Sequence, residues 1–203
     1  LSSAASDVYK RQLAYSGYER AVADFGMEGT FLEPDGGGEN RGELLELCAE
    51  AGNDLIIGNG FLFDASMNEV APNYPDLNFA ITDGVAEPAN VRGMLFDHAE
   101  GSFLAGVAAA LKSTNNHVGF LGGVDFPLIH EFEQGFIAGV QAINPDIVIE
   151  IGYASVAPDF SGFNDVVKGK EIALAQYEAG ADVIYHAAGG TGTGMFEAAT
   201  VSY

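Results

Sequence analysis

The stretch from His117 to Tyr153, HVGFLGGVDFPLIHEFEQGFIAGVQAINPDIVIEIGY, decides the fold class. It opens with a short apolar run at His117–Leu121, continues as a helical pattern at Leu128–Ile143 and returns to an apolar run at Ile147–Tyr153. Short, uniformly apolar strands fit a sheet that is covered on both faces, and parallel strands need a crossover such as a helix. The stretch therefore predicts an α/β protein with a parallel sheet.

The same alternation of strand and helix extends in both directions. The other apolar runs that predict strands are Thr30–Leu32, Asp54–Gly58, Asn78–Thr82, Val91–Phe96 and Asp182–Ala187. The other helical patterns are Ala14–Phe25, Gly42–Ala51, Ala99–Lys112, Val166–Ala179 and Gly194–Ala199. Gly180 follows one of these helices directly, as a C-terminal cap does.

The two ends of the chain do not read as natural sequence. Residues Ser2–Gln12 fit the in-frame translation of a sequencing-library adapter, and Val201–Tyr203 fit its complementary strand. We therefore assign residues 1–12 and 200–203 to adapter and exclude them from the fold. Because a parallel sheet normally places a strand before a helix such as Ala14–Phe25, we expect the fold to be truncated at both ends.

A polar stretch, Ser113–Asn116, separates a long helix from the next strand. It predicts an N-terminal α/β lobe of residues 13–113, without its first strand, and an incomplete C-terminal lobe of residues 114–199. A simple loop within one sheet is the alternative.

The chain is strongly acidic, with 8 Lys+Arg against 29 Asp+Glu and a formal net charge of −21. Such a surface repels phosphates, so nucleic acid is excluded as a partner. Self-repulsion at this charge weakens in salt, which suggests a halophilic or saline source, although an ordinary acidic protein is the alternative. No apolar run is long enough to be a transmembrane helix.

Candidate ligand-binding residues follow the ends of the predicted strands. Ligands of open α/β sheets bind beyond the carboxyl ends of the strands, where glycines allow close approach and carboxylates accept hydrogen bonds from hydroxyls. Asp83 is the strongest candidate, with a turn or helix-cap aspartate as the alternative. The segments selected in this way are residues 58–61, 83–84, 122–125 and 187–190, which include Gly60, Phe61, Asp125 and Gly189.

Two further loops are candidates for ligand binding. Gly189–Gly194 matches the spacing of neither known phosphate-binding fingerprint, so a tight turn beside a cleft is the better interpretation. Phe163, in the loop before Val166–Ala179, could stack on a flat ligand or cover the core. The four histidines and Cys48 show no metal-ligand spacing, and there is no G-x-S-x-G motif. We predict no catalysis, no metal and no cofactor.

Several segments, in order, resemble a known family. They are EGSFLAG at 100–106, GFLGG at 119–123, FEQGFIAGV at 132–140, FND at 163–165 followed by KGKE at 168–171, GADVI at 180–184, and AAGGTGTG at 187–194, with YPD at 74–76 and FAITD at 79–83 before them. Together they are similar to the basic membrane protein family, the purine-nucleoside-receptor-like substrate-binding lipoproteins of ABC transporters.

The resemblance implies a type I periplasmic-binding-protein fold, in which two Rossmann-like lobes close on a small ligand. It implies a nucleoside ligand, ABC permease subunits as partners and an extracytoplasmic, lipid-anchored location. By position, Asp83 corresponds to a pocket aspartate and Phe163 to the stacking aromatic of the second lobe. Gly60, Phe61, Asp125 and Gly189 would line the pocket.

Two ligand-contacting segments of the family, an N-terminal D-D-x-S-F-N loop and a later ribose-binding segment, fall outside residues 13–199. Two alternatives therefore stay open. The same fold could bind a sugar or another small metabolite, or the chain could belong to a cytoplasmic α/β regulator or enzyme.

Overall fold

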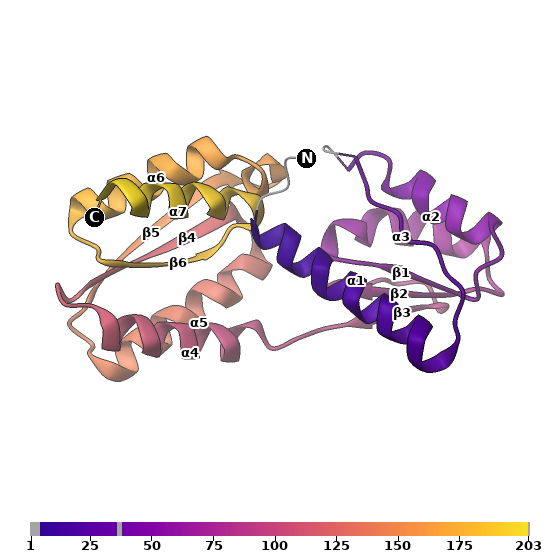
Figure 1. Cartoon of the computed structure of the whole chain (residues 1–203), viewed down its shortest axis with the longest axis horizontal. Helices are drawn as coiled ribbons and strands as arrows, with labels where there is room; N and C mark the ends of the chain where they lie inside the picture. The colour runs from indigo at the N-terminus through magenta and orange to yellow at the C-terminus, as the bar shows by residue number, and fades with distance from the viewer. Residues whose placement is uncertain (1–4, 36–37, 203) are drawn as a thin grey trace. The chain divides into compact units, whose positions relative to one another are not determined.

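The computed structural model describes the backbone of residues 5–35 and 38–202 and the side chains of residues 13–35 and 38–202. The chain forms two compact units, one of Arg11–Phe96 and one made mainly of Asp97–Tyr203 (Figure 1). Each unit contains a three-stranded parallel sheet. The predicted α/β class with parallel sheets is therefore confirmed.

The first unit is built on strands β1 (Leu55–Gly58), β2 (Asn78–Thr82) and β3 (Val91–Met94), in the order β1-β2-β3. Its helices are α2 (Arg41–Glu50) and α3 (Asp64–Val70), with short 3₁₀ turns η1 (Phe61–Phe63) and η2 (Ala71–Asn73) on either side of α3, and the part of α1 (Ala5–Phe25) from Arg11 onward also belongs to it. Met67, Phe79 and Ile81 are fully buried between the sheet and the helices. The crossover from β1 to β2 therefore runs through α3.

The second unit has β4 (His117–Asp125) at the centre of the order β5-β4-β6, with β5 (Val148–Val156) and β6 (Val183–Ala187) beside it. Helices α4 (His98–Lys112) and α5 (Pro127–Ile143) cover one face, and α6 (Val166–Ala179) and α7 (Gly192–Ser202) cover the other (Figure 1). Two 3₁₀ turns, η3 (Phe160–Phe163) and η4 (Gly189–Thr191), follow β5 and β6.

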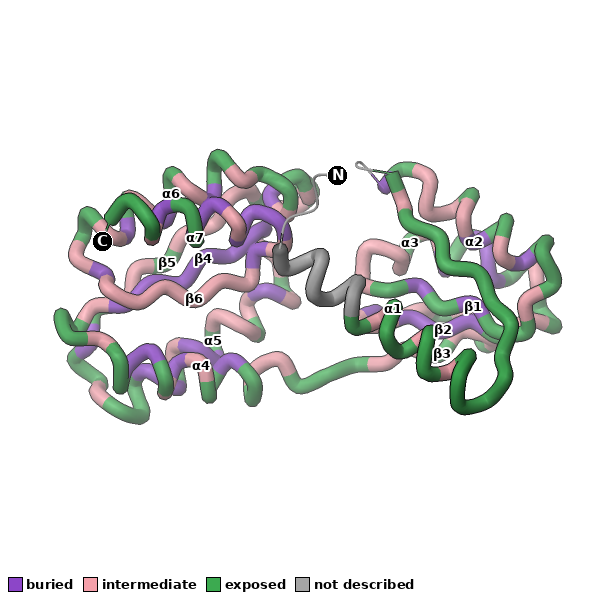
Figure 2. The backbone as a smooth tube through the Cα atoms, in the orientation of Figure 1, coloured by how far each residue is buried: buried purple, intermediate pink, exposed green. Residues whose placement is uncertain are grey.

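Strand β4 is the buried centre of this unit, as Figure 2 shows. Val118 and Phe120 belong to the core beneath α4 and α5, whereas Leu121 belongs to the core beneath α6 and α7. Successive residues of a strand point to opposite faces, so an uninterrupted apolar run fills both cores. This is the arrangement that the stretch His117–Tyr153 predicts.

The division between the units lies at Phe96 and Asp97, before α4, and not at the predicted Ser113–Asn116 boundary. Helix α4 packs on α5 so closely that a Cβ atom at Gly106 would overlap the carbonyl oxygen of Phe136. This contact of backbone on backbone makes α4 part of the second unit. The polar stretch after α4 is a loop inside that unit, which was the alternative.

Apart from shifts of up to three residues at element ends, four elements differ from the sequence-based expectations. Thr30–Leu32 forms no strand in the described chain, because this three-residue run between Gly29 and Glu33 is largely exposed and pairs with no other strand. Helix α1 begins at Ala5 and not at Ala14, since no Gly or Pro interrupts residues 5–16. Helix α3 was not predicted. Strand β4 continues to Asp125, beyond the predicted end at Leu121.

The adapter interpretation of residues 2–12 and 201–203 stays a prediction; residues 2–4 and 203 lie outside the described residues. Among the described helices, none combines the length and the apolar character that a membrane span requires.

Candidate functional site

At the carboxyl edge of the first sheet, the turns after β1 and β2 are joined by one threonine. The backbone N–H of Gly60 donates to Thr82 Oγ1 at 2.7 Å, and Thr82 Oγ1 in turn donates to Asn59 Oδ1 at 2.9 Å. Gly60 has φ of 106°, a conformation that side chains rarely adopt. The edge that carries Gly60 and Phe61 is therefore a fixed turn, and Thr82 is a contributor that the strand-end rule did not select.

Asp83, the strongest sequence candidate, directly follows β2. Its φ of 57° places it in the left-handed region, which aspartate tolerates better than most residues. Its backbone N–H donates to the carbonyl oxygen of Met94 at 2.9 Å, so the turn is tied to β3. The left-handed backbone conformation of Asp83 is therefore held by its hydrogen bond to β3.

Helix α3 holds the loop that follows Asp83. Asn68 Oδ1 accepts the backbone N–H of Glu87 at 2.9 Å. One turn earlier, the carboxylate of Asp64 lies against Gly84 and faces the backbone N–H of Val85. Burial raises the pKa of Asp64, and the Val85 N–H partly offsets this rise. Two side chains at positions i and i+4 of one helix therefore support the loop.

At the carboxyl edge of the second sheet, Asp125 ends β4 and pairs with His130 of α5, with 2.7 Å between Oδ1 and Nε2. Beside them, Tyr153 of β5 donates a short hydrogen bond to Glu133. Burial raises the pKa of the Tyr153 phenol well above its ordinary range, and the Glu133 carboxylate raises it further. Tyr153 is therefore a neutral hydrogen-bond donor, and this edge presents carboxylates held by fixed partners.

Phe163 lies at the same edge, in η3. Its ring covers Gly123 so closely that a Cβ atom there would overlap it, and Gly189 supports it from the β6–α7 turn. The ring also packs against the core beneath α4 and α5, and the residue stays half-buried. The structure thus brings Phe163 and Gly189 together. Gly123 is a strand residue that makes room for the ring.

A pair of aromatic rings, Phe126 and Phe160, also lies at the carboxyl edge of the second sheet. Phe126 follows β4 and Phe160 begins η3, and their rings meet edge to face at 5.5 Å between centroids. The strand-end rule did not select Phe126, although it directly follows Asp125. Aromatic faces, carboxylates and backbone groups of glycine are binding groups for a flat polar ligand.

The glycine-rich loop 189–194 is explained by packing. A Cβ atom at Gly192 would overlap the His186 ring, and one at Gly194 would overlap the carbonyl oxygen of Val166. These glycines let α7 approach β6 and α6. Burial lowers the pKa of His186, so this histidine is neutral in the core.

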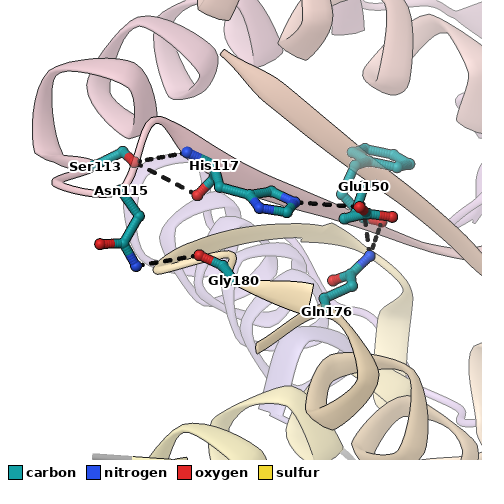
Figure 3. Close-up of polar contacts among 7 residues, drawn as sticks. Ser113, Asn115, His117, Glu150, Gln176 and Gly180 are labelled. Atoms are coloured by element: carbon teal, nitrogen blue, oxygen red, sulfur yellow. Dashed lines mark hydrogen bonds and ion pairs between the residues drawn. The ribbon is translucent and has the colours of Figure 1, made fainter. Parts of the chain in front are cut away.

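The amino edge of the second sheet carries a separate polar network (Figure 3). His117 Nε2 lies 3.2 Å from Glu150 Oε1, and Asn115 Nδ2 donates to the carbonyl oxygen of Gly180 at 3.2 Å. The buried side chain of Gln176 donates to the carbonyl oxygen of Phe120 at 2.9 Å. These contacts tie strands and loops to one another at the edge opposite the candidate residues, so we assign them to stability.

Metal coordination finds no support in the described side chains, which include no group of three or more His, Cys, Asp or Glu placed to hold an ion. His98 stacks on Phe132 at 4.5 Å, and burial raises the pKa of Cys48.

Two parallel sheets with carboxylates, aromatic rings and glycines at their carboxyl edges define a class of α/β proteins that bind small molecules. The chain belongs to the Bmp family, described as "ABC transporter substrate-binding protein PnrA-like", whose model matches residues 3–201. The expected basic membrane protein resemblance is thereby confirmed.

Individual relatives agree with this assignment. The "ABC transporter nucleoside-binding protein BmpA" of Lactococcus lactis is 40% identical over 151 residues, which are 74% of this chain and 41% of the relative. "Basic membrane protein A" of Borreliella burgdorferi is 36% identical over 159 residues, or 76% of this chain and 45% of the relative. The chain thus spans less than half the length of these curated relatives.

A solved structure supports the fold. The solute-binding protein of an ABC transporter system from Aeropyrum pernix superimposes with a TM-score of 0.81 at 28% identity, covering 98% of this chain and 56% of that one. The match is consistent with a type I periplasmic-binding-protein fold of which this chain spans a part.

Proposed function

We propose that the full-length protein is the extracytoplasmic substrate-binding component of an ABC transporter and that it binds a purine or other nucleoside. One observation carries the proposal: the chain belongs to a family of transporter substrate-binding proteins, and a relative 40% identical to it is named a nucleoside-binding protein. ABC permease subunits are the proposed partners, and a lipid anchor is the proposed attachment to the membrane.

The chemistry of the two carboxyl edges supports this ligand class. A carboxylate such as Asp83 accepts two hydrogen bonds from hydroxyl or N–H groups, which both the sugar and the base of a nucleoside supply. An aromatic ring such as Phe163 stacks on the flat base. We assign ligand contacts to Asp83 and Phe163, and lining positions to Gly60, Phe61, Asp125 and Gly189.

Binding alone is sufficient for this role, and we propose no catalysis. A ligand that binds one conformation of a protein more tightly shifts the population toward that conformation. A permease that recognises the ligand-bound form then takes up the ligand.

Thermal unfolding of the full-length protein with inosine, guanosine or adenosine tests the proposal. A ligand present at about 100 times its Kd stabilises the folded protein by about 2.7 kcal/mol, so the unfolding midpoint should rise. Phe163→Ala should abolish the rise. Phe196→Ala, which removes a half-exposed ring from helix α7 of the same unit, should leave it intact.

Two outcomes would contradict the proposal. No shift with any nucleoside at millimolar concentration would exclude the nucleoside assignment. A shift with glucose or another sugar, and none with nucleosides, would favour the same fold with a different ligand.

A further inference from the structure

Thr191 is the buried polar side chain that joins the loops at the carboxyl edge of the second unit. It is 0% exposed, in the short turn η4 between β6 and α7. Its hydroxyl donates to the carbonyl oxygen of Gly162 at 2.6 Å and accepts the backbone N–H of Asp165 at 2.8 Å. The single hydroxyl thus uses its donor and one of its acceptor sites.

The two partners of this hydroxyl bracket Phe163. Gly162 precedes Phe163 in η3, and Asp165 follows it after one intervening residue. Gly162 is itself buried, and a Cβ atom there would overlap the carbonyl oxygen of Gly123. The backbone on both sides of the Phe163 ring is therefore fixed by one side chain of a different loop.

Asp165 also determines where the next helix begins. It is the N-cap of α6, and its carboxylate accepts the backbone N–H of Lys168 at 2.9 Å. N-cap residues fix the entry of the chain into a helix. By accepting the N–H of Asp165, Thr191 therefore fixes the residue at which the chain passes from η3 into α6. It thereby also fixes the path of the loop between η3 and α6.

The same turn that carries Thr191 supports the Phe163 ring. Gly189, two residues before Thr191, lies beside the ring, which covers Gly123 on β4. The β6–α7 turn thus contacts the ring through Gly189 and the backbone of its loop through Thr191. A buried hydroxyl left without partners would cost free energy, so this pairing is strongly specified.

We propose that Thr191 is a positioning residue for ligand binding: its hydroxyl holds the segment 162–165 so that the Phe163 ring is preorganised for stacking. Thr191 does not touch the ligand in this proposal. The inference rests on the proposed function, because it assigns Phe163 to a nucleoside contact. Preorganisation of a binding loop raises affinity because less conformational freedom is lost when the ligand binds.

The test compares three variants of the full-length protein. Thr191→Val keeps the shape and removes the hydroxyl, whereas Thr191→Ser keeps the hydroxyl and removes a methyl group. Ser102→Ala is the matched control, because Ser102 is 1% exposed in the same unit and its hydroxyl bonds Tyr185 at 3.1 Å, between α4 and β6. Two quantities are compared, hydrogen exchange of the Asp165 amide without ligand and the Kd for inosine, and the thermal unfolding midpoint of each variant is measured beside them.

We expect Thr191→Val to accelerate exchange of the Asp165 amide and to raise the Kd about tenfold, as loss of a buried hydrogen-bond partner does. Thr191→Ser should restore both quantities to near the wild-type values. Ser102→Ala should lower thermal stability and leave both unchanged. A rise in Kd that is equal in Thr191→Val and Ser102→Ala would overturn the proposal, since it would follow stability alone.

The hydrogen-exchange measurement needs no ligand. Failure of the proposed function can therefore be distinguished from failure of the inference about Thr191. If the wild-type protein binds no nucleoside, the proposed function fails, and exchange still decides whether Thr191 orders the loop. If Thr191→Val does not fold, hydrogen exchange of the Asp165 amide in the wild-type protein tests the inference. Exchange as fast as that of an exposed loop amide overturns the inference, and strong protection supports it.

Discussion

Replacing Asp182 by Asn tests the physical account of the amino edge of the second sheet. Asp182 Oδ2 accepts three hydrogen bonds, from Thr114 N at 2.6 Å, Thr114 Oγ1 at 2.8 Å and Asn115 N at 3.0 Å. Burial by itself would raise the pKa of this carboxyl, but hydrogen bonds from Ser113, Thr114 and Asn115 outweigh burial and lower the pKa to about 2. The carboxylate thus anchors the loop after α4 to the start of β6.

The size of the effect follows from the pKa. Each pKa unit corresponds to about 1.4 kcal/mol, so lowering the pKa of Asp182 from its ordinary value of 3.8 to about 2 corresponds to roughly 2–3 kcal/mol. Solvent screens a partly exposed carboxylate, so we expect about 1–2 kcal/mol. A carboxylate whose pKa falls on folding stabilises the folded state above its unfolded-state pKa. That contribution is lost as the pH falls from about 4 to about 2.

The assay is urea-induced unfolding of the full-length protein at a series of pH values from 7 to 2, followed by circular dichroism. Asp182→Asn should be less stable than the wild type at pH 7, and the difference should disappear toward pH 2. Asp146→Asn, which removes the same charge from an exposed loop, is the control and should show no such loss. A wild-type-to-variant difference that stays constant between pH 7 and pH 2 would refute the reasoning.

Two further predictions concern packing and charge. Gly106→Ala should lower the free energy of unfolding by about 1–3 kcal/mol, because its methyl group would overlap the Phe136 carbonyl oxygen. Gly101 lies in the same helix with open space around it, so Gly101→Ala should raise the free energy of unfolding by about 0.5–1 kcal/mol. Chemical unfolding measures both variants, and a change of the same sign in the two would contradict the packing argument. The unfolding midpoint should rise between about 0.01 M and 1 M NaCl, as the Debye length shrinks from about 30 Å to 3 Å, whereas an unchanged midpoint would exclude strong self-repulsion.

Sequence patterns predicted the strands well where an apolar run was long enough to be buried. Strand β2 was predicted with its bounds, and β4 was predicted at its start. The end of β4 was missed because Gly122 and Gly123 read as a loop. In the structure they continue the ladder, since the rings of Tyr153 and Phe163 occupy the space that their side chains would need.

Helix α3 was missed for a different reason. Its seven residues are too few to show a clear helical period, and 3₁₀ turns flank it. The signal that could have revealed it was topological. Two parallel strands at Asp54–Gly58 and Asn78–Thr82 require a crossover, and the residues between them had no assigned structure.

The boundary between the units could not be read from composition. Ser113–Asn116 is polar because its groups bind Asp182 and the amino ends of the strands, and a linker would look the same in the sequence. What places α4 in the second unit is its close contact with α5 through glycines, which depends on three-dimensional packing.

The candidate site shows the same limit at the level of single residues. Strand-end reasoning selects side chains of a type that can contact a ligand, such as Asp83 and Asp125, and the loop before Val166–Ala179 supplies Phe163. It cannot select the residues that hold them, because a buried threonine and a surface threonine are identical in a sequence. The supporting roles of Thr82 and Thr191 were identified from the structure, which shows the backbone groups that each hydroxyl binds.

This difference has a consequence for comparing relatives within the family. Under the proposed function, two proteins that share Phe163 and Asp83 would present the same contact groups. We expect their affinities to differ if one of them lacks the hydroxyl at position 191, because the ligand then has to order the loop. A Thr→Ser exchange at position 191 preserves both hydrogen bonds, whereas Thr→Val or Thr→Ala removes them. If the proposed positioning role is right, the residue type at position 191 affects ligand affinity indirectly, through the order of the loop that carries Phe163, although its side chain is fully buried.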